Sequence, residues 1–499
     1  MTNTSMPPFF TCEPPPPRRL PAAESRKTRV LVLYHPGLLT LLGLFLLFPV
    51  HTLALEFDQA LSRMMAENQR IAASRSAMEQ REAEEKAARG LYYPKVQVSA
   101  SWTHMDAPLE VELGALGAMT GQLIHTLHPG LPPQQIAAIA GQMPQSHRLQ
   151  DQNFIKSDLT LSWPVYTGGK ITAANRAAEV RRRLSIHESE GLTDQMFSEL
   201  VRLYFGVRLA DAVVKVRCEV HEGMKQHLHQ AMRLEETGMI ALAERLHAQV
   251  AAEEADREYK KAVRDAEIAR TALKTLIACE DKVQPLSPLF FNRNIPDLDH
   301  FTEKARSQNA ILRQLHQQQD LAAAGLQMEK SAYRPEIFLF GTRALAQDDL
   351  TALDPQWAAG VGARFTLFDG FARPGKVAAA DALSRQVRQL HAQAIRDVET
   401  LVESRYQSLM QAIEQIDALA ASRTFAREYL RVRTRAFEEG FATSLDVVDA
   451  EMALSRVQIA HLQALFAFDL ALAKLLEAAG DTQAFEQYRK QAEKEAEIP

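Results

Sequence analysis

Two acidic residues follow a glycine near the end of the chain. Asp446 and Asp449 lie six and nine residues after Gly440, and residues three apart on a helix share one side. Carboxylates gathered on one side would attract cations and repel anions. Asp446 also lies three residues after Thr443, where it could complete a capping box at a helix start. Both interpretations are open for Asp446, whereas capping explains less about Asp449.

The same turn occurs earlier in the chain. The stretch 235–259 has the plan of the stretch 438–462, with a glycine, an acid six residues later and a long Ala-rich helix. The earlier glycine is Gly238 and its acid is Glu244, while His247 stands in the place of the second aspartate. The acidic pair is therefore not duplicated. Both glycines suit a tight turn at positive φ, which is a sufficient backbone reason for them.

Other patterns that carry chemistry do not stand out. The sequence has no recognisable nucleophile and base arrangement, phosphate-cradling glycine loop or metal signature. Histidines gather at His104, His125, His128 and His147, but they lack a helical i, i+4 pair and a nearby cysteine. The 3 cysteines are too few and too far apart for a disulfide framework or a zinc site. We therefore predict no enzyme, no cofactor and no metal site.

The composition is that of a folded chain without a polyanionic partner. Of the 499 residues, 46% are hydrophobic and 24% are charged, which lies in the globular range. A formal net charge of −5 removes any general electrostatic reason to bind nucleic acid. We predict no nucleic-acid partner.

The amino terminus has the order of a signal peptide. A Pro-rich basic lead precedes an apolar run at 38–48, and Thr52-Leu53-Ala54 follows Pro49. We expect residues 1–54 to be a leader that is cleaved after Ala54, although the true start could lie downstream. A membrane anchor is the alternative, but it needs about 20 apolar residues. No later segment is apolar enough to predict a membrane-spanning helix. Any membrane-spanning part of the chain must therefore have another secondary structure.

Prolines divide the rest of the chain. None occurs between residues 164 and 285 or between 374 and 499, and helix interiors reject proline. Both gaps therefore predict long helical hairpins, which turn at Gly238 and Gly440. Apolar residues of the last hairpin recur at steps of three and four, the spacing of a coiled-coil seam. This seam begins with Val398, Val402, Tyr406, Leu409, Ile413, Ile416 and Ala420.

Upstream of each hairpin the spacing of apolar residues changes to every second position. Apolar and polar residues alternate at 95–103 and 154–165, as in strands of a membrane β-barrel or of a soluble sheet. Two more strands are predicted at 335–344 and 358–368, of which the first alternates less cleanly. Aromatic residues at these strands could form a belt at the bilayer interface or pack in a core. They are Trp102, Trp163, Tyr166 and Trp357.

The chain reads as a duplication. Each half has the order helix, strand, loop, strand, long helix, glycine turn, long helix. We assign residues 55–285 to the first repeat, 286–296 to a linker, 297–480 to the second repeat and 481–499 to a polar tail. The first repeat is longer by a loop at about 105–153, where we expect a polar, Pro-interrupted segment with one short helix.

Four strands cannot close a barrel by themselves. Backbone groups at the sheet edges would face hydrocarbon unpaired, at several kcal/mol each. Small closed barrels need at least about eight strands, so two copies would suffice and three would enclose a wider tube. The predicted fold class is therefore mainly α with membrane β, in an oligomer with a hollow axis.

Three features resemble the TolC family of outer-membrane efflux proteins. They are the duplicated strand-and-hairpin plan, the sequence LFDG at 367–370 entering a long helix, and the pattern G-x-x-x-S-x-D-V-V-D-A-E from Gly440 to Glu451. The resemblance covers about residues 55–480. It implies a homotrimeric α/β-barrel in outer-membrane lipid, a helical tunnel in the periplasm, and docking to a periplasmic adaptor (a membrane fusion protein) and an inner-membrane transporter.

The resemblance also implies roles for the residues at the two turns. Gly238 and Gly440 would lie at the periplasmic tip, where the tunnel narrows and the adaptor docks. Asp446 and Asp449 would form acidic rings in this constriction, with Glu244 facing them.

The gate of the family is not reproduced here. In TolC-like gates a tyrosine before the second glycine and an arginine after it bind an acid on the neighbouring hairpin. This chain has Phe437 and Ala442 at those places, and only the acid, Glu244, is kept. The closed state therefore needs other contacts, for which Arg435 and Arg245 are the candidates.

These observations predict a passive exit channel. It would serve a tripartite efflux or type I secretion system, in the outer membrane with a periplasmic extension. The rival is a periplasmic coiled-coil adaptor or bridging protein without a pore. Adaptors usually have one hairpin flanked by non-alternating β modules, whereas this chain has two hairpins, each after two-faced strands. No motif specifies the cargo.

Overall fold

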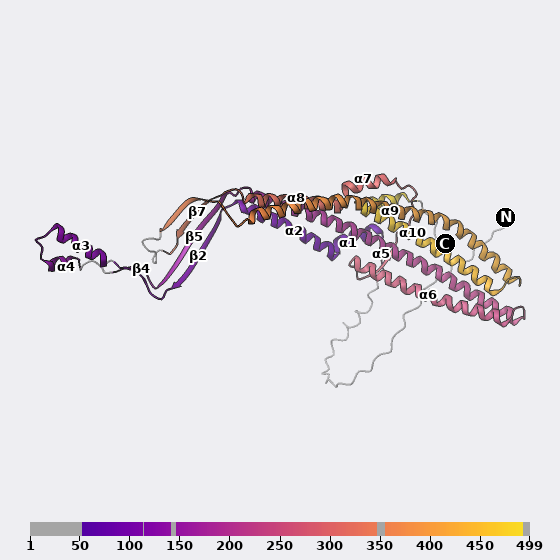
Figure 1. Ribbon diagram of the computed structural model, residues 1–499. Helices are drawn as coiled ribbons and strands as arrows, with labels where there is room; N and C mark the ends of the chain where they lie inside the picture. Colours follow the sequence, from indigo (N-terminus) through magenta and orange to yellow (C-terminus); the bar gives the residue numbers. More distant parts are fainter. Residues whose placement is uncertain (1–51, 113, 141–145, 347–354, 493–499) are drawn as a thin grey trace, which may run out of the picture. The chain divides into compact units, whose positions relative to one another are not determined.

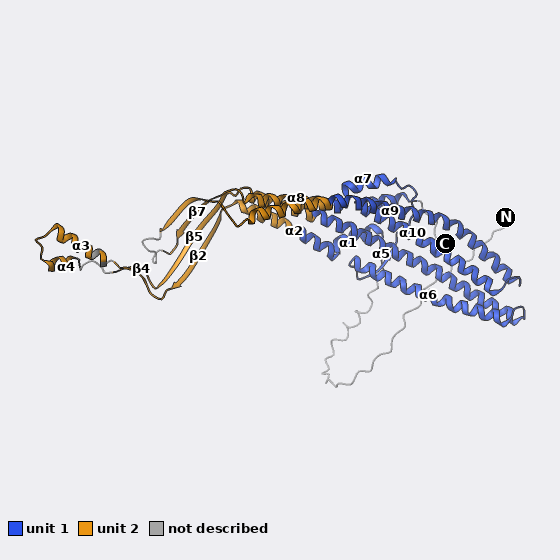
Figure 2. Cartoon of the chain, viewed as in Figure 1, with its two compact units in different colours: residues 1–78, 186–314, 391–499 blue, residues 79–185, 315–390 orange. Residues whose placement is uncertain are grey.

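A computed structural model describes residues 52–112, 114–140, 146–346 and 355–492. The predicted leader up to residue 51 lies outside the described residues. The chain forms two compact units, one from residues 1–78, 186–314 and 391–499 and the other from 79–185 and 315–390 (Figure 2). Each sequence repeat contributes to both units, which we describe separately as unit 1 and unit 2.

Unit 2 contains a four-stranded antiparallel sheet in the order β2-β5-β7-β8 (Figure 1). Its strands are β2 (Lys95–His104), β5 (Asn153–Tyr166), β7 (Glu336–Ala344) and β8 (Trp357–Arg364). All four predicted strands are present, with small shifts at their ends. Within the described residues the edge strands β2 and β8 each pair on one side only, so each exposes a row of backbone donors and acceptors.

The sheet has an apolar face and a more polar face. Cross-strand pairs place Trp102 beside Ile155 and Val98 beside Leu159, while Gln97 pairs with Thr160 on the opposite face. The apolar face contains Val96, Val98, Ala100, Trp102, Ile155, Leu159, Leu161, Trp163, Leu339, Val361, Ala359 and Trp357. The same register places Ser157, Gly341 and Arg343 on this face. The alternation predicted for these strands thus describes the two faces of one sheet.

The uneven alternation of β7 has a packing cause. Phe338 and Phe340 lie on the more polar face, opposite Gly362 and Gly360 of β8. A Cβ on Gly362 would lie 2.4 Å from Cζ of Phe338, and one on Gly360 would lie 2.9 Å from Cζ of Phe340. Each aromatic ring therefore covers a glycine of the next strand, which puts apolar side chains where the period predicts polar ones.

The long loop of the first repeat differs from its prediction. It contains the antiparallel strands β3 (Leu109–Glu112) and β4 (Ser146–Gln150). Between them lie two helices, α3 (Gly114–Leu127) and α4 (Pro133–Ala140), instead of the one short helix expected. Neither helix contains an Asp, Glu, Lys or Arg residue. The expected helix is α4, in which Pro133 occupies the first turn, where proline is tolerated. The helix that the prediction missed is α3, whose glycines lower its helix propensity.

The helices repeat in the same order in both halves. The first half has α1 (Phe57–Glu67), α2 (Gln69–Arg89), a 3-10 turn at Gly90–Tyr92, α5 (Lys170–Glu236) and α6 (Leu242–Leu276). The second half has α7 (Leu298–Gln308), α8 (Ala310–Ser331), α9 (Ala372–Glu438) and α10 (Ser444–Ala479). Both predicted long hairpins are therefore present.

An asparagine marks the same break in each repeat. Asn68 separates α1 from α2, and its Nδ2 donates to the Leu276 carbonyl at 2.8 Å. Asn309 separates α7 from α8, and its Nδ2 donates to the Ala478 carbonyl, also at 2.8 Å. Each asparagine satisfies a carbonyl near the end of the last helix of its own repeat. The two sequence repeats thus also share this asparagine-to-carbonyl hydrogen bond.

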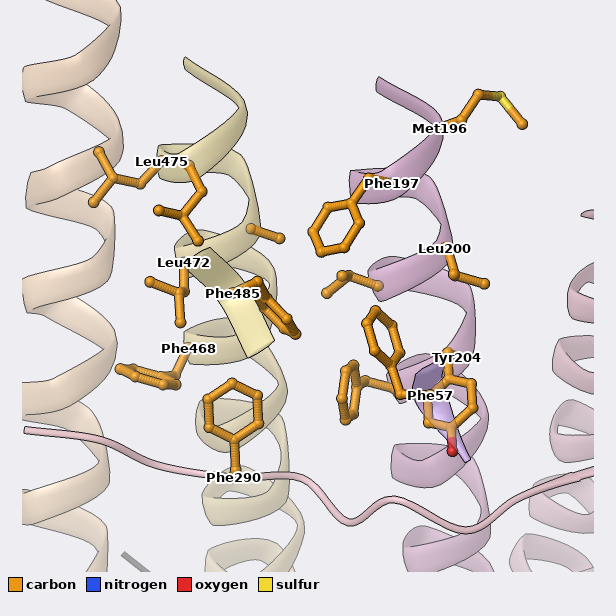
Figure 3. Close-up of a cluster of buried hydrophobic side chains, with 14 of the residues drawn as sticks. Phe57, Met196, Phe197, Leu200, Tyr204, Phe290, Phe468, Leu472, Leu475 and Phe485 are labelled. Carbon is orange, nitrogen blue, oxygen red and sulfur yellow. The ribbon is translucent and has the colours of Figure 1, made fainter. Parts of the chain in front are cut away.

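Unit 1 has an aromatic core to which segments of both repeats contribute (Figure 3). Phe57 of α1 stacks on Phe205 of α5 with ring centroids 5.5 Å apart. Phe290 comes from the segment predicted as a linker, and its ring lies 5.8 Å from that of Phe468 in α10. Fully buried Phe485 begins α11 (Phe485–Gln491), which the prediction of a polar tail missed.

A short parallel pair holds the amino-terminal end of unit 1. Strand β1 (Thr52–Leu55) pairs with β6 (Lys282–Pro285). Tyr204 on α5 donates its hydroxyl to the Leu55 carbonyl at 2.7 Å, and the same oxygen accepts from the Ser287 N–H at 2.9 Å. Cleavage after Ala54 would remove most of β1.

Helix α10 is long and apolar enough to pass as a membrane span by composition. An 18-residue window in it has a mean hydropathy of 1.5, contrary to the expectation that no later segment would reach this level. Of that window, 56% is buried within the protein. The apolar composition reflects packing on more than one side, because α10 contributes Leu465, Phe468 and Leu472 to the core of unit 1.

Candidate functional site

The two hairpin turns of unit 1 have the same backbone. Gly238 has φ +75° and Gly440 has φ +79°. At each turn the residue after the glycine donates to a carbonyl five positions earlier: Met239 to Leu234 at 2.8 Å and Phe441 to Ala436 at 2.7 Å. This is the Schellman arrangement, which needs a residue at positive φ and favours glycine. The backbone explanation for both glycines is thus correct, and it leaves their docking role a prediction.

Helix α10 begins with a capping box. The Asp446 N–H donates to Oγ1 of Thr443 at 3.3 Å, and the Thr443 N–H donates to the Asp446 carboxylate at 2.9 Å. These bonds from Thr443 lower the pKa of Asp446. Arg433 of α9 lies 3.6 Å from the same carboxylate. The capping interpretation of Asp446 therefore holds, and the carboxylate is already occupied in a single chain.

Helix α6 begins without such a box. Its cap position is Ala241, which has no side-chain acceptor. Glu244, at the position that Asp446 takes in α10, accepts instead from the Ser444 N–H at 2.8 Å. That N–H is one of the free donors in the first turn of α10. A carboxylate of the first repeat therefore caps a helix of the second repeat.

A buried histidine adds a second bond to the same serine. Nε2 of His227 on α5 lies 2.7 Å from Oγ of Ser444, which is itself fully buried. Burial lowers the pKa of His227, although the Glu244 carboxylate acts in the opposite direction. The His227 ring also contacts that of Phe437, with centroids 4.7 Å apart. We call His227, Glu244, Phe437 and Ser444 the tip cluster.

Phe437 fills the centre of the tip cluster. It is 1% exposed and packs with Ala231, Ala248 and Val447. The residue in the place of the gate tyrosine is thus a core residue here, and it has no hydroxyl to bind the facing acid. The helices α5, α6, α9 and α10 meet around its ring.

The arginines suggested as gate partners do not contact Glu244. Arg245 pairs with Glu235 at 2.7 Å, and Arg435 lies 3.6 Å from Glu439. Both pairs join residues of the same hairpin. Within one chain the Ser444 N–H, and neither of these arginines, binds the facing acid Glu244. A role of Arg435 or Arg245 in the closed state stays a prediction.

Asp449 differs from the other two predicted acids. It is exposed, one turn after Asp446. No hydrogen bond or ion pair of Asp449 occurs among the described residues. Glu244 and Asp446 both have structural bonds, so Asp449 is the predicted acid whose carboxylate has no such bond among the described residues.

Sequence reasoning missed a second acidic pair. Glu451 on α10 is largely buried, and burial together with nearby Glu219 on α5 raises its pKa to about 7. Burial also raises the pKa of Glu219, against Arg427 and Lys215. A Cβ on Gly223 of α5 would lie 3.5 Å from Oε1 of Glu451, so the glycine leaves room for this carboxyl. The partners are far apart in sequence, and no local pattern could reveal them.

The four predicted interface aromatics are all exposed in the single chain. Trp102 and Trp357 are about 70% exposed, at 69% and 70%, and Trp163 and Tyr166 are less so. Core packing within the chain is therefore excluded for them. Trp102 pairs with Ile155, and Trp163 lies further along the same strand, about 26 Å away at roughly 3.3 Å per residue. The apolar band of outer-membrane barrels is about 25 Å tall.

Comparisons with known proteins agree on one family. The family model of outer membrane efflux proteins matches residues 60–278 and 302–481. The Campylobacter jejuni CmeC outer membrane channel is 14% identical, with 88% of this chain and 90% of that chain covered and a TM-score of 0.69. The Neisseria gonorrhoeae MtrE outer membrane channel in its open state is 16% identical, with 85% and 89% covered and a TM-score of 0.65.

A third solved structure gives the same result. The outer membrane protein VceC from Vibrio cholerae is 15% identical, with 85% of this chain and 96% of that chain covered and a TM-score of 0.66. At these identities the likeness establishes a shared fold. Among curated protein sequences no match is found.

Proposed function

The chain belongs to the outer membrane efflux protein family, and we propose that it is the passive outer-membrane exit channel of a tripartite efflux or type I secretion system. Its partners would be further copies of itself, outer-membrane lipid, a periplasmic adaptor and an inner-membrane transporter. The energy for transport would come from that transporter.

One observation carries the proposal: a two-faced sheet, whose edge strands pair on one side only within the described residues, precedes long helical hairpins. The edges β2 and β8 can be satisfied in lipid only if they pair with β8 and β2 of neighbouring copies. Three copies would give a closed barrel whose apolar face, with Trp102 and Trp163, contacts lipid. The more polar face would then line an aqueous passage.

The helical turns are the proposed adaptor site. Several large apolar residues near them are exposed, and Phe441, directly after Gly440, is 83% exposed. The others are Met239, Leu242, Leu246 and Leu445. Apolar side chains gathered around two rigid turns suit a docking surface for another protein. We assign Gly238 and Gly440 to this surface as the turns that present it.

The tip cluster is the proposed gate. Because Glu244 and His227 both bind Ser444, they hold the first hairpin against the start of α10. Separation of the hairpins would break the charge-assisted bond from the Ser444 N–H to Glu244, which is worth about 1.5–3 kcal/mol. This is small enough for an adaptor to supply by binding the open form more tightly.

Asp449 is the proposed selectivity residue. In an assembly of three chains its carboxylates would form a ring of negative charge near the tip, favouring cations. Asp446 and Glu244 would add to the field at this constriction, although their bonds tie them to helix ends.

Purified protein in detergent tests the proposal directly. We expect native mass spectrometry to give a trimer, gel mobility to change on boiling, and planar bilayers to show cation-preferring conductance. A monomer that salt or urea releases from membranes, without conductance, would instead favour the periplasmic bridging protein.

A further inference from the structure

The loop between β2 and β5 has a segment without charge. From residue 113 to residue 147 there is no Asp, Glu, Lys or Arg, in a chain where 24% of residues are charged. This segment includes α3 and α4, which contact one another (Figure 1). Exposed helices of soluble domains normally have a charged face. The apical hairpin, as we call α3 and α4, therefore has the composition of an interface.

The apical hairpin buries little of its apolar surface within the chain. Met119, Leu123 and Leu127 follow one another at steps of four on α3, and each is at least 60% exposed. Ile139 on α4 is also exposed, whereas Ile136 is buried. A continuous stripe of large apolar side chains thus faces away from the hairpin's own contact.

Charged residues separate the apical hairpin from the membrane sheet. The strands β3 and β4 form a stalk in which Arg148 lies 3.4 Å from Glu110 and 3.1 Å from Asp151. Asp106 and Glu112 add further negative charge to it. Residues 105–112 can span up to about 26 Å at roughly 3.3 Å per residue. The stalk therefore separates the hairpin from the ends of β2 and β5 by a charged segment.

We propose that the apical hairpins of neighbouring copies pack on one another through the Met119, Leu123 and Leu127 stripe. The proposal rests on the assembly proposed above, in which equal stalks carry one hairpin per copy to the same level. Tethering at this range gives each apical hairpin a millimolar effective concentration near its neighbours, so modest apolar contacts suffice to hold the hairpins together. The interface continues the pairing of edge strand β2, which leads directly into the stalk.

A lipid surface fits the apical hairpin less well. Helices that lie on membranes normally have Lys and Arg on their polar face, and α3 and α4 have none. The acidic stalk would also be repelled by anionic headgroups. A charged protein partner is disfavoured too, because nothing on the hairpin could pair with its charges. A second copy of the same uncharged surface is the occupant that meets these conditions.

Cysteine cross-linking in intact outer membranes tests the proposal. Leu123→Cys is introduced into the full chain with Cys218→Ser and Cys279→Ala, and the matched control is His125→Cys, exposed on the other side of α3. Under mild oxidation we expect covalent dimers and trimers from Leu123→Cys at a rate at least about tenfold above the control. Neither Leu123 nor His125 is a buried group, so both variants should fold.

The outcomes separate this proposal from the function. Equal rates for the two cysteines, with a trimer still present by native mass spectrometry, would overturn the hairpin contact and leave the channel intact. Quenching by doxyl lipids of a bimane attached to the Leu123→Cys variant, without cross-links, would overturn it in favour of the membrane surface. A monomer in every assay would contradict both proposals. Leu123→Asp should lower the temperature at which the trimer dissociates, whereas His125→Asp should not.

Discussion

The two hairpin turns of unit 1 share one backbone conformation but differ in their side-chain hydrogen bonds. Both turn at a glycine with φ near +75°, at +75° and +79°, and both have an acid six residues later. Asp446 bonds with Thr443 and caps its own helix. Glu244 follows Ala241 and caps the first turn of α10 instead. Loss of one hydroxyl at a cap position thus frees a carboxylate to join the two repeats.

The difference teaches how a duplicated chain can gain a switch. Contacts that stay within a repeat, such as those of Asp446, survive any movement of one hairpin relative to the other. Contacts between repeats, such as those of Glu244 and His227 with Ser444, must break when the hairpins separate. Substitutions at equivalent positions should therefore have unequal effects on opening.

The largest effect is expected at Phe437. Truncation to alanine removes a ring that is 1% exposed, at a cost of about 3–5 kcal/mol. Hydrogen exchange at the turn around Gly440 should rise steeply in Phe437→Ala. In Phe441→Ala, where the ring is 83% exposed, exchange should stay near wild type. Equal exchange in the two variants would contradict the packing described for the tip cluster.

Glu451 should give the next largest effect, with a clear pH dependence. Its pKa is raised to about 7, so the folded state holds a proton that the unfolded chain releases near pH 4.5. Stability is therefore full below pH 4.5 and falls as pH rises to about 7. At pH 8 Glu451→Gln should gain up to about 3 kcal/mol at 1.36 kcal/mol per pKa unit, and almost nothing at pH 4.5.

Thermal melts across this pH range measure the effect of Glu451. The matched position in the first hairpin is Gln249, which is exposed and uncharged. Gln249→Glu should leave the melting temperature nearly unchanged at both pH values. A pH-independent gain in Glu451→Gln would contradict the buried acid.

Glu244 should matter more than Asp446 for opening. Glu244→Gln removes a charge-assisted bond to a buried N–H, worth about 1.5–3 kcal/mol, and should raise the open fraction roughly tenfold or more. Asp446→Asn weakens only a cap, worth about 0.5–1 kcal/mol. Single-channel recordings of both variants measure the difference. An Asp446→Asn channel that opens as often as Glu244→Gln would remove the distinction between the two turns.

Acidification should open the tip to a smaller degree. His227 is neutral when buried, and its pKa lies below the usual value of 6.5. As the pH falls below about 6.5, His227 is protonated more readily in the opened or unfolded state than in the closed state. The closed state therefore loses stability in that range. The open fraction should rise between pH 7 and pH 5.5 in the wild type. His227→Gln should not respond, and an unchanged response there would assign it to another group.

Asp449 should affect selectivity with little effect on stability. Its exposed carboxylate makes no bond in the described part of the chain, so Asp449→Asn should change stability by less than about 0.5 kcal/mol. The reversal potential measured in a salt gradient should move toward zero, the value for a channel without ion selectivity. His247→Asn, at the equivalent place in the first hairpin, is the control and should leave this potential unchanged.

Local periodicity carried most of the fold. The four strands and both hairpins were predictable because a period of two, a period near 3.5 and proline-free stretches are properties of neighbouring residues. The prediction failed where a partner lies far away in sequence. The rings of Phe338 and Phe340 cover glycines of β8, and fully buried Phe485 anchors a charged tail in the core of unit 1.

The candidate site was predictable as a place but not as a set of contacts. The glycine turns and their acids stand out by repetition. Glu244 binds the Ser444 N–H because Ala241 has no hydroxyl to occupy its carboxylate and because the helices of the two repeats bring the two atoms within 2.8 Å. His227 and Glu451 gave no signal, because a single histidine or glutamate on a helix is usually solvated.

Closure of the sheet between copies is the most direct test of the whole account. Val98→Cys in β2 is combined, one at a time, with a cysteine at Ala359, Val361 or Ala363 in β8, all on the apolar face. If neighbouring copies complete the barrel, oxidation in outer membranes should join chains in at least one combination, in a ladder that stops at three. Chains that stay monomeric in all three combinations would contradict it.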